Sequence, residues 1–71
     1  MENNKQFEKL GIEIKLARTK NKLTQKELSV KSGVAESTIV RIENGQSKAH
    51  PDVIYKLALA LNEDAEKWFN L

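Results

Sequence analysis

The chain has 71 residues, 39% of them hydrophobic and 31% charged, and a formal net charge of +2. This length predicts one domain over residues 1–71, and the composition is typical of a soluble globular protein rather than a disordered or membrane-embedded one. Because the chain holds no cysteine and one histidine, disulfides, Cys-ligated metals and His-based metal clusters are excluded, and we expect neither a metal nor another cofactor.

Apolar residues recur at helical spacing five times along the chain, which predicts an all-α fold of five short helices. In the first helix, over about residues 4–20, the positions at this spacing are Phe7, Leu10, Gly11, Ile14 and Ala17. The second helix begins at a capping box, in which the side chains of Thr24 and Glu27 each accept a hydrogen bond from the other's main-chain amide. Gly33 and Gly45 follow the second and third helices, since glycine adopts a helix-terminating conformation without strain.

The second and third predicted helices form a helix-turn-helix over about residues 24–44. The third helix is expected over residues 35–44, with Ile39 and Ile42 facing inward. Only about three residues separate the two helices, which is too short for antiparallel packing and favours a steep crossing. Val34 lies in this turn and is expected to fill the gap between the helices.

Two further helices complete the prediction. Pro51 fits the first turn of the fourth helix, where its missing N–H is harmless. An apolar stripe follows it at Ile54, Leu57, Ala58 and Leu61. Asp64 is expected to cap a last short helix that holds Trp68 and Phe69.

Three segments of the chain carry a family resemblance. They are Leu10-Gly11-x-x-Ile14-x-x-Ala17-Arg18, Leu23-Thr24-Gln25-x-Glu27-Leu28 and Gly33-Val34-x-x-Ser37-Thr38-Ile39-x-Arg41-Ile42-Glu43-Asn44-Gly45. At this spacing they resemble the lambda-repressor-like family of Cro/repressor-type regulators, also called the Xre family, and the resemblance covers about residues 7–69. It implies a compact five-helix domain that binds double-stranded DNA and regulates transcription, most often as a repressor or controller.

The chain departs from the family pattern at two helix ends. Ala35 stands where the family most often has Ser or Thr as the N-cap of the third helix. The lost hydroxyl should cost about 1 kcal/mol of helix stability. Glu63 replaces an expected apolar residue, so the sequence does not fix how the last helix approaches the core.

In the family, the third helix lies in the DNA major groove with its N-terminal residues at the base edges. The matching positions are Ala35, Glu36, Ser37, Thr38 and Arg41. Arg41 can donate two hydrogen bonds to guanine, Glu36 can accept one from cytosine, and Ala35 can pack against a thymine methyl. The other interpretation is that Glu36 balances the helix dipole and pairs with Arg41. Val40 is expected to face solvent beside Glu36.

The resemblance also implies two groups of phosphate-binding residues, which position the protein on DNA. Thr24 and Gln25 stand at the N-terminus of the second helix, where the helix dipole favours a phosphate. The alternative for Gln25 is a solvated polar residue without a ligand. The second group is Asn44, Ser47 and Lys48, in and after the turn that follows the third helix.

Arg18 and Glu43 are expected to form a structural ion pair across the fold. Each charge lies four residues after an inward-facing isoleucine, Ile14 or Ile39, where the apolar stripe would otherwise continue. Opposite charges at core-edge positions of two neighbouring helices are best explained by each other.

A homodimer is expected, because one reading helix contacts too few base pairs for useful specificity in a genome. The expected interface is Leu59, Leu61, Phe69 and Leu71. Residues 1–50 hold ten Lys or Arg against six Asp or Glu, whereas residues 51–71 hold two against four, so the C-terminal end should face away from DNA. Ile12 and Leu16 form a competing apolar patch, and Phe69 and Leu71 can instead cover the core of a monomer.

The alternative function is that of an antitoxin, which binds a toxin protein as well as its own operator. An enzyme is not expected, because the carboxylates are dispersed among lysines and no glycine-rich phosphate loop exists. The longest apolar stretch, residues 57–61, is far shorter than the ~20 residues that cross a bilayer. With no apolar run at the N-terminus to suggest a signal peptide, we expect no membrane association and a cytoplasmic location.

Overall fold

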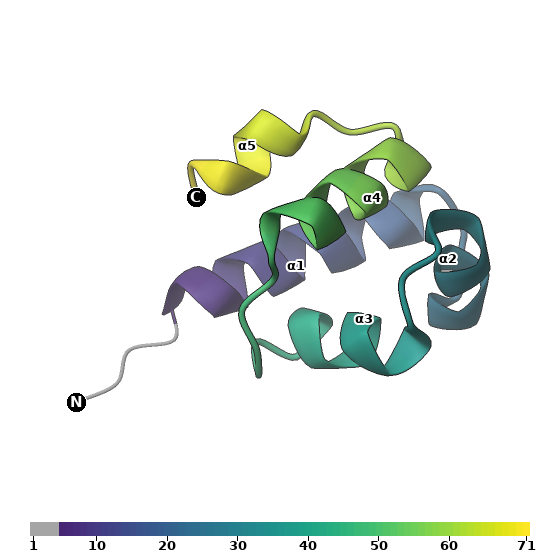
Figure 1. The fold of residues 1–71 in the computed structure, drawn as a ribbon, viewed down its shortest axis with the longest axis horizontal. Helices are drawn as coiled ribbons and strands as arrows, with labels where there is room; N and C mark the ends of the chain where they lie inside the picture. Colours follow the sequence, from purple (N-terminus) through teal and green to yellow (C-terminus); the bar gives the residue numbers. More distant parts are fainter. Residues whose placement is uncertain (1–4) are drawn as a thin grey trace.

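The computed structural model describes residues 5–71, which form five α-helices and no strand (Figure 1). In chain order they are α1 (Lys5–Lys20), α2 (Gln25–Ser32), α3 (Glu36–Glu43), α4 (Pro51–Leu61) and α5 (Ala65–Phe69). The all-α fold expected from the sequence is therefore confirmed, although Asn4, the expected start of the first helix, lies outside the described residues. Within that range, no helix combines the length and apolar character that a membrane crossing requires.

Local hydrogen bonds and backbone geometry set the helix ends. The Thr24 hydroxyl accepts a hydrogen bond from the Glu27 amide at 3.0 Å, and the Glu27 carboxylate accepts one from the Thr24 amide at 2.8 Å. This completes the predicted capping box at the start of α2. Gly33 ends α2 with a φ of +79°, a value that only glycine adopts without strain. Asp64 caps α5 by accepting from the Glu66 amide at 3.0 Å.

The core lies where α1 to α4 meet. Its largest fully buried side chains are Ile14, Leu28, Ile39, Ile42, Leu57 and Leu61. Val34, in the turn between α2 and α3, is 5% exposed and packs with this cluster, as the sequence predicts. Burying one such aliphatic side chain contributes about 1.5–3 kcal/mol, so these few residues are the main source of stability in a chain this short.

α1 and α3 approach each other closely at Gly11. A Cβ on Gly11 would lie 2.8 Å from the carbonyl oxygen of Glu43 and closer still to that of Ile42. Any larger residue would therefore push the two helices apart. The contact fixes the C-terminal end of α3 against α1.

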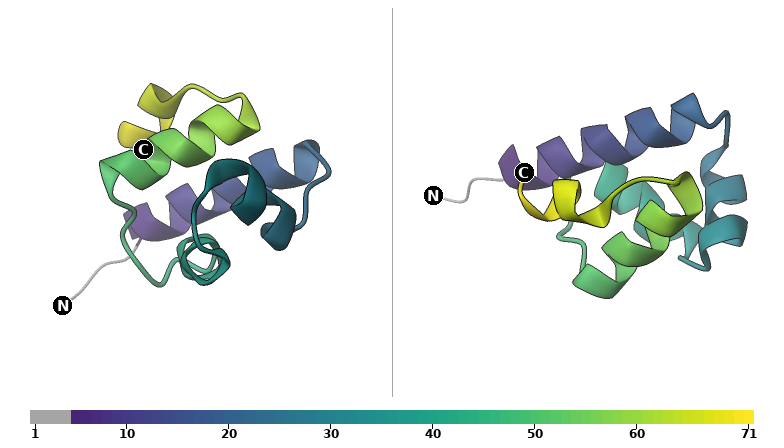
Figure 2. Two further views of the ribbon diagram at one scale, coloured as in Figure 1. Left: turned by 45° about the vertical axis from the view of Figure 1, so that its right-hand side comes forward. Right: turned by 90° about the horizontal axis from the view of Figure 1, so that it is seen from above.

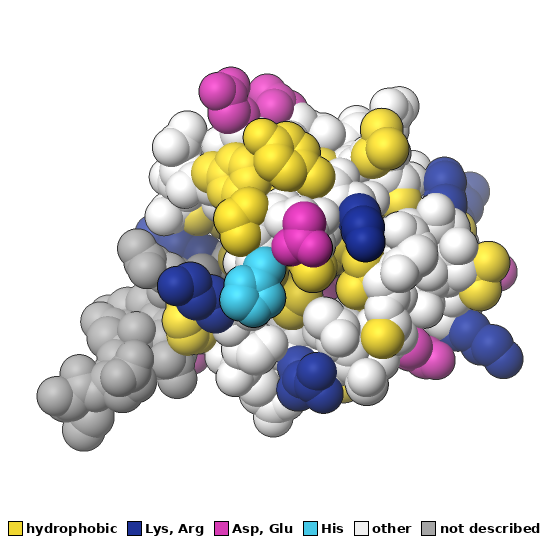
Figure 3. Space-filling model, in the orientation of Figure 1, with side chains coloured by type: hydrophobic (Ala, Val, Ile, Leu, Met, Phe, Trp, Pro, Cys, Tyr) yellow, Lys and Arg dark blue, Asp and Glu magenta, His cyan; other side chains and the backbone are white. Residues whose placement is uncertain are grey.

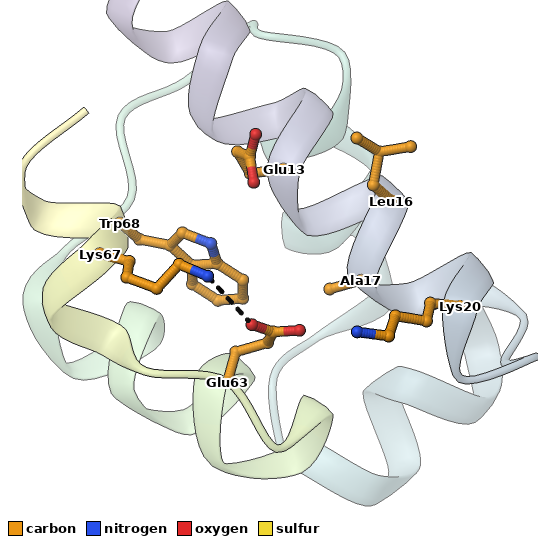
Figure 4. A pocket seen from close by; sticks show the side chains of 7 residues that line it. All are labelled: Glu13, Leu16, Ala17, Lys20, Glu63, Lys67 and Trp68. Atoms are coloured by element: carbon orange, nitrogen blue, oxygen red, sulfur yellow. Dashed lines mark ion pairs between the residues drawn. The ribbon is translucent and has the colours of Figure 1, made fainter.

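α5 packs onto the rest of the molecule through Trp68, whose side chain lies under a hollow between α5 and α1 (Figure 4). The hollow is lined by Glu13, Leu16, Ala17, Lys20, Glu63, Lys67 and Trp68. The Glu63 carboxylate lies at this hollow, 3.8 Å from the Lys67 ammonium. A charged residue is tolerated at the position where an apolar one was expected, because its carboxylate faces the hollow rather than the core.

α3 and α5 lie on opposite sides of the molecule (Figure 1). In this view α3 runs along the lower edge and α5 along the upper edge, with α1 and α4 between them. The left view of Figure 2, which looks along the axis of α3, shows the same separation. One side of the molecule is therefore formed by the helix-turn-helix and the other by α4 and α5.

Candidate nucleic-acid interface

The helix-turn-helix formed by α2 and α3 leaves one face of α3 open to solvent. Ile39 and Ile42 point into the core, so the positions on the opposite side of the helix, Ser37 and Arg41, turn outward. No other helix lies below α3 in Figure 1 or in the left view of Figure 2. A protruding helix of this kind can enter the major groove of B-form DNA, which is about 12 Å wide.

Most of the predicted base-reading residues are exposed, and Ser37 and Arg41, four residues apart, share the outward face. Exposed side chains are those of Ala35, Glu36, Ser37 and Arg41, and that of Thr38 is half-buried. Among the side chains of residues 7–71 the ion pairs are Arg18–Glu43 and Glu63–Lys67, so Glu36 and Arg41 do not pair with each other. Both charged side chains therefore remain available to a ligand.

Val40 differs from its prediction. It is half-buried rather than exposed, so the expectation that it faces solvent is wrong. Val40 directly follows the buried Ile39, and a helix turns by about 100° per residue, which places Val40 at the margin of the buried face.

The expected phosphate-binding residues lie at the N-terminus of α2 and after the C-terminus of α3. Thr24 is exposed, and its hydroxyl oxygen already accepts a hydrogen bond from the Glu27 amide. The hydroxyl can still donate a hydrogen bond to a phosphate. In the second group, Asn44 and Lys48 are exposed and Ser47 is half-buried. Main-chain hydrogen bonds hold the turn that carries Asn44 and Ser47. In one of them the Gln46 amide donates to the Arg41 carbonyl oxygen at 2.9 Å.

Gln25 is neither fully solvated nor free to rotate. It is half-buried, and its side-chain Nε2 donates a hydrogen bond to Oε1 of Glu43 at 3.0 Å. This bond joins the N-terminus of α2 to the C-terminus of α3. It therefore brings the first group of expected phosphate-binding residues beside the start of the second group.

The expected ion pair between Arg18 and Glu43 is present and is bidentate. Arg18 Nε donates to Glu43 Oε2 at 2.7 Å, and Arg18 Nη2 donates to Glu43 Oε1 at 3.0 Å. The two side chains are 13% and 2% exposed. Arg18 Nη1 also donates to the carbonyl oxygen of Leu23 at 2.8 Å. The pair thus connects α1, the segment before α2 and the end of α3.

An exposed apolar patch lies on α4 and α5, on the side of the molecule away from α3. The sequence places Leu59, Phe69 and Leu71 in this patch, and all three are exposed, Leu59 at 84%. Leu61 is 1% exposed and belongs to the core, so its assignment to the interface is wrong: it lies on the buried stripe of α4.

Tyr55 is the member of the patch that the sequence analysis missed. It is 60% exposed, and its ring meets that of Phe69 edge to face, with centroids 5.3 Å apart. Its spacing four residues before Leu59 was the available signal, since residues four apart share a helix face. Figure 3 shows apolar side chains grouped over α4 and α5, with Lys and Arg side chains scattered over the rest of this face.

The structure of residues 5–71 gives less support to other kinds of site. No three His, Asp or Glu side chains of residues 5–71 are grouped so that they could hold a metal ion. Ile12 and Leu16 on α1 are both more than half exposed, so the competing patch exists as a surface. It contains two apolar side chains, fewer than the patch on α4 and α5.

Comparison with known proteins agrees with this geometry. Residues 14–68 match a family described as Helix-turn-helix. The chain is similar to the solved structure of the restriction-modification controller protein C.AhdI from Aeromonas hydrophila, at 32% sequence identity and a TM-score of 0.83, over 89% of this chain and 96% of that one. A comparison with curated proteins found no match. The chain belongs to the Xre-type, lambda-repressor-like helix-turn-helix family of DNA-binding regulators, which are not enzymes.

Proposed function

We propose that this helix-turn-helix protein is a transcriptional regulator that binds a palindromic operator as a homodimer, through one DNA-binding domain per chain. The observation that carries the proposal is the outward face of α3: Ser37 and Arg41 are exposed, and no other helix lies below α3 in Figure 1. Family membership supports DNA as the ligand. The likeness to a controller protein supports regulation as the role.

The base contacts are assigned by side-chain chemistry. Arg41 lies four residues after Ser37, so the two share a helix face. Arg41 donates two hydrogen bonds to O6 and N7 of a guanine, Glu36 accepts from N4 of a cytosine, and Ala35 contacts a thymine methyl. Ser37 and Thr38 donate to a base or to an adjacent phosphate.

The phosphate contacts flank this reading face. At the N-terminus of α2, Thr24 and Gln25 meet a phosphate in the field of the helix dipole. Beyond α3, Asn44, Ser47 and Lys48 meet a second one. These contacts fix the position and orientation of α3 in the groove without reading sequence.

The dimer forms through the patch of Tyr55, Leu59, Phe69 and Leu71. Exposed apolar patches on small proteins mark interaction sites, and this one lies apart from α3, so it leaves the reading face free. In a dimer that binds a palindrome, the two copies of α3 would read half-sites about 34–36 Å apart.

The antitoxin alternative receives no specific support from residues 5–71. Its partner surface would have to be found beside the dimer patch, and Ile12 and Leu16 are the exposed apolar side chains of α1. Controller proteins and antitoxins can be distinguished by the partners that they bind. Copurification of a second protein with the full chain from its native cell would favour the antitoxin.

Selection of binding sites from random duplex DNA tests the proposal. We expect the wild type to enrich a palindrome and Arg41→Ala to lose about 1–3 kcal/mol of discrimination at one base pair of each half-site. Lys48→Ala should weaken binding to every sequence alike and reduce the salt slope by about one unit per chain. Lys56→Ala, an exposed lysine on α4, is the matched control.

Two results would count against this assignment. A wild-type chain that enriches no sequence would contradict an operator-specific regulator. An unchanged preference in Arg41→Ala would remove that residue from the base-reading set while leaving the rest of the proposal intact.

A further inference from the structure

We propose that Glu43 is a positioning residue for DNA binding. Its buried carboxylate, held by Arg18, anchors the side-chain amide of Gln25 at the first turn of α2, so that the second N–H of that amide is presented to a DNA phosphate. The inference rests on the proposed function and adds to it a role for a residue that no DNA reaches directly.

The geometry around Glu43 supports a fixed carboxylate. Arg18 donates to both oxygens of Glu43, at 2.7 and 3.0 Å. Oε1 accepts a further hydrogen bond from Nε2 of Gln25 at 3.0 Å. Because the Glu43 side chain is 2% exposed, water does not compete for these bonds. The carboxylate is therefore held in one orientation, and its hydrogen bond to Nε2 fixes the orientation of the Gln25 side-chain amide.

The chemistry of the two groups determines which atom of Gln25 faces inward. An ionised carboxylate only accepts hydrogen bonds, so the amide nitrogen and not the amide oxygen must face Glu43. Nε2 carries two hydrogens, and the bond to Glu43 uses one of them. The second hydrogen is the donor that a phosphate oxygen can accept, at the N-terminus of α2 where the helix dipole also favours an anion.

Arg18 makes this arrangement compatible with an anion. A buried carboxylate beside a phosphate site would repel the phosphate if it carried an uncompensated charge. The bidentate Arg18 guanidinium neutralises Glu43 at hydrogen-bond distance. The Arg18–Glu43 pair therefore holds Gln25 without adding a net negative charge that would repel the DNA phosphates.

Anchoring affects affinity because ordering a long side chain on binding carries an entropy cost. Fixing one flexible side chain at an interface costs enough to change affinity about 3- to 10-fold. A Gln25 amide that is already held by Glu43 avoids most of this cost. Loss of the anchor should therefore weaken DNA binding only when Gln25 itself is present.

A double-mutant cycle on DNA affinity tests this dependence. The anchor is removed by Arg18→Met with Glu43→Met, a change that conserves net charge and replaces a buried ion pair with apolar side chains, which proteins often tolerate. We expect this change to weaken operator binding about 3- to 10-fold when Gln25 is present. In a Gln25→Ala background the same change should have no further effect, although Gln25→Ala alone weakens binding.

A second measurement does not depend on how the doubly substituted chain folds. In the wild type, NMR should show one Gln25 side-chain amide proton protected from exchange with water before DNA is added. The other proton should become protected when the operator is added. The side-chain amide of the exposed Gln46 is the control and should remain unprotected in the free protein.

Three results would overturn the inference. If loss of the Arg18–Glu43 pair weakens DNA binding equally in the Gln25 and Gln25→Ala backgrounds, the pair supports the fold in general and does not act through Gln25. Two freely exchanging Gln25 side-chain protons in the free protein would show that Glu43 does not anchor the amide. A wild-type chain that binds no DNA at all would overturn the proposed function as well, which separates that failure from the first two.

Discussion

A single carboxylate, that of Glu43, accepts hydrogen bonds from Arg18 on α1 and Gln25 on α2. Its burial makes the three side chains depend on one another. A buried charge is tolerated when its hydrogen bonds are satisfied, and it becomes a large penalty when one partner is removed. The cost of losing Arg18 should therefore exceed the small net gain that the ion pair itself contributes.

Arg18→Met should lower the free energy of unfolding by about 3–5 kcal/mol, because it leaves the Glu43 carboxylate buried without its counter-ion. Urea unfolding followed by circular dichroism measures the change. Lys15→Met, an exposed position on the same helix, should change stability by no more than about 0.5 kcal/mol. If the two variants unfold at the same urea concentration, the ion pair contributes no more than an exposed one.

At the residue scale, the sequence predicts positions better than it predicts hydrogen bonds. The Arg18–Glu43 pair follows from two charges at places where an apolar stripe would continue, and both residues lie where that spacing puts them. The Gln25–Glu43 bond does not follow, because spacing places Gln25 at a helix start but leaves its side-chain rotamer open. Only the packing of α2 against α3 decides which of those rotamers meets a carboxylate.

At the scale of one element, α3 begins without a side-chain cap. Ala35 occupies the N-cap position with φ −58° and ψ 139° and makes no side-chain hydrogen bond there. An N-cap hydroxyl would satisfy one of the free amides of the first turn. α3 is therefore held by the burial of Ile39 and Ile42 and not by its own N-terminus.

Ala35→Ser should raise the free energy of unfolding by about 1 kcal/mol, because the serine hydroxyl can accept from an amide of the first turn of α3. Thermal unfolding measures the gain. Ala35→Val, which brings no hydrogen-bond acceptor, is the control and should bring no stabilisation. An unchanged melting temperature for Ala35→Ser would mean that the amides of this first turn already have water as an adequate partner.

Helix bounds are the best predicted elements of the fold because they depend on local chemistry. The capping box of Thr24 and the left-handed Gly33 mark the ends of α2 in the sequence and in the structure alike. The burial of Val40 on α3 was not predictable in this way, because the width of a buried face depends on how closely neighbouring helices approach.

At the scale of the whole molecule, α3 and the apolar patch lie on different parts of the surface. Under the proposed function, this separation lets one chain bind DNA and a second copy at once. It was only partly predictable. The acidic balance of residues 51–71 indicates the right end of the molecule, but the expected interface includes Leu61, which belongs to the apolar stripe of α4, and leaves out the exposed Tyr55. The contact of Tyr55 with Phe69 depends on how α5 approaches α4, which the sequence does not fix.

Leu59→Glu should abolish self-association without unfolding the chain, because Leu59 is 84% exposed and contributes little to its own core. Sedimentation at micromolar concentration measures the change in mass. Val30→Glu is the matched control, since Val30 is 79% exposed on α2 and lies outside the patch. This interface would be contradicted by a wild type that sediments as a monomer without DNA and binds a palindrome no more tightly than the Leu59→Glu variant does.

The division of α3 into an inward and an outward face has a consequence for how such a protein changes over generations. Ile39 and Ile42 maintain the fold, whereas Glu36, Ser37 and Arg41 add little to it. Under the proposed base contacts, single substitutions at these three outward positions alter which DNA is preferred while every intermediate remains folded. A lineage can therefore move from one operator to another in small steps, and two descendants in one cell can come to ignore each other's sites.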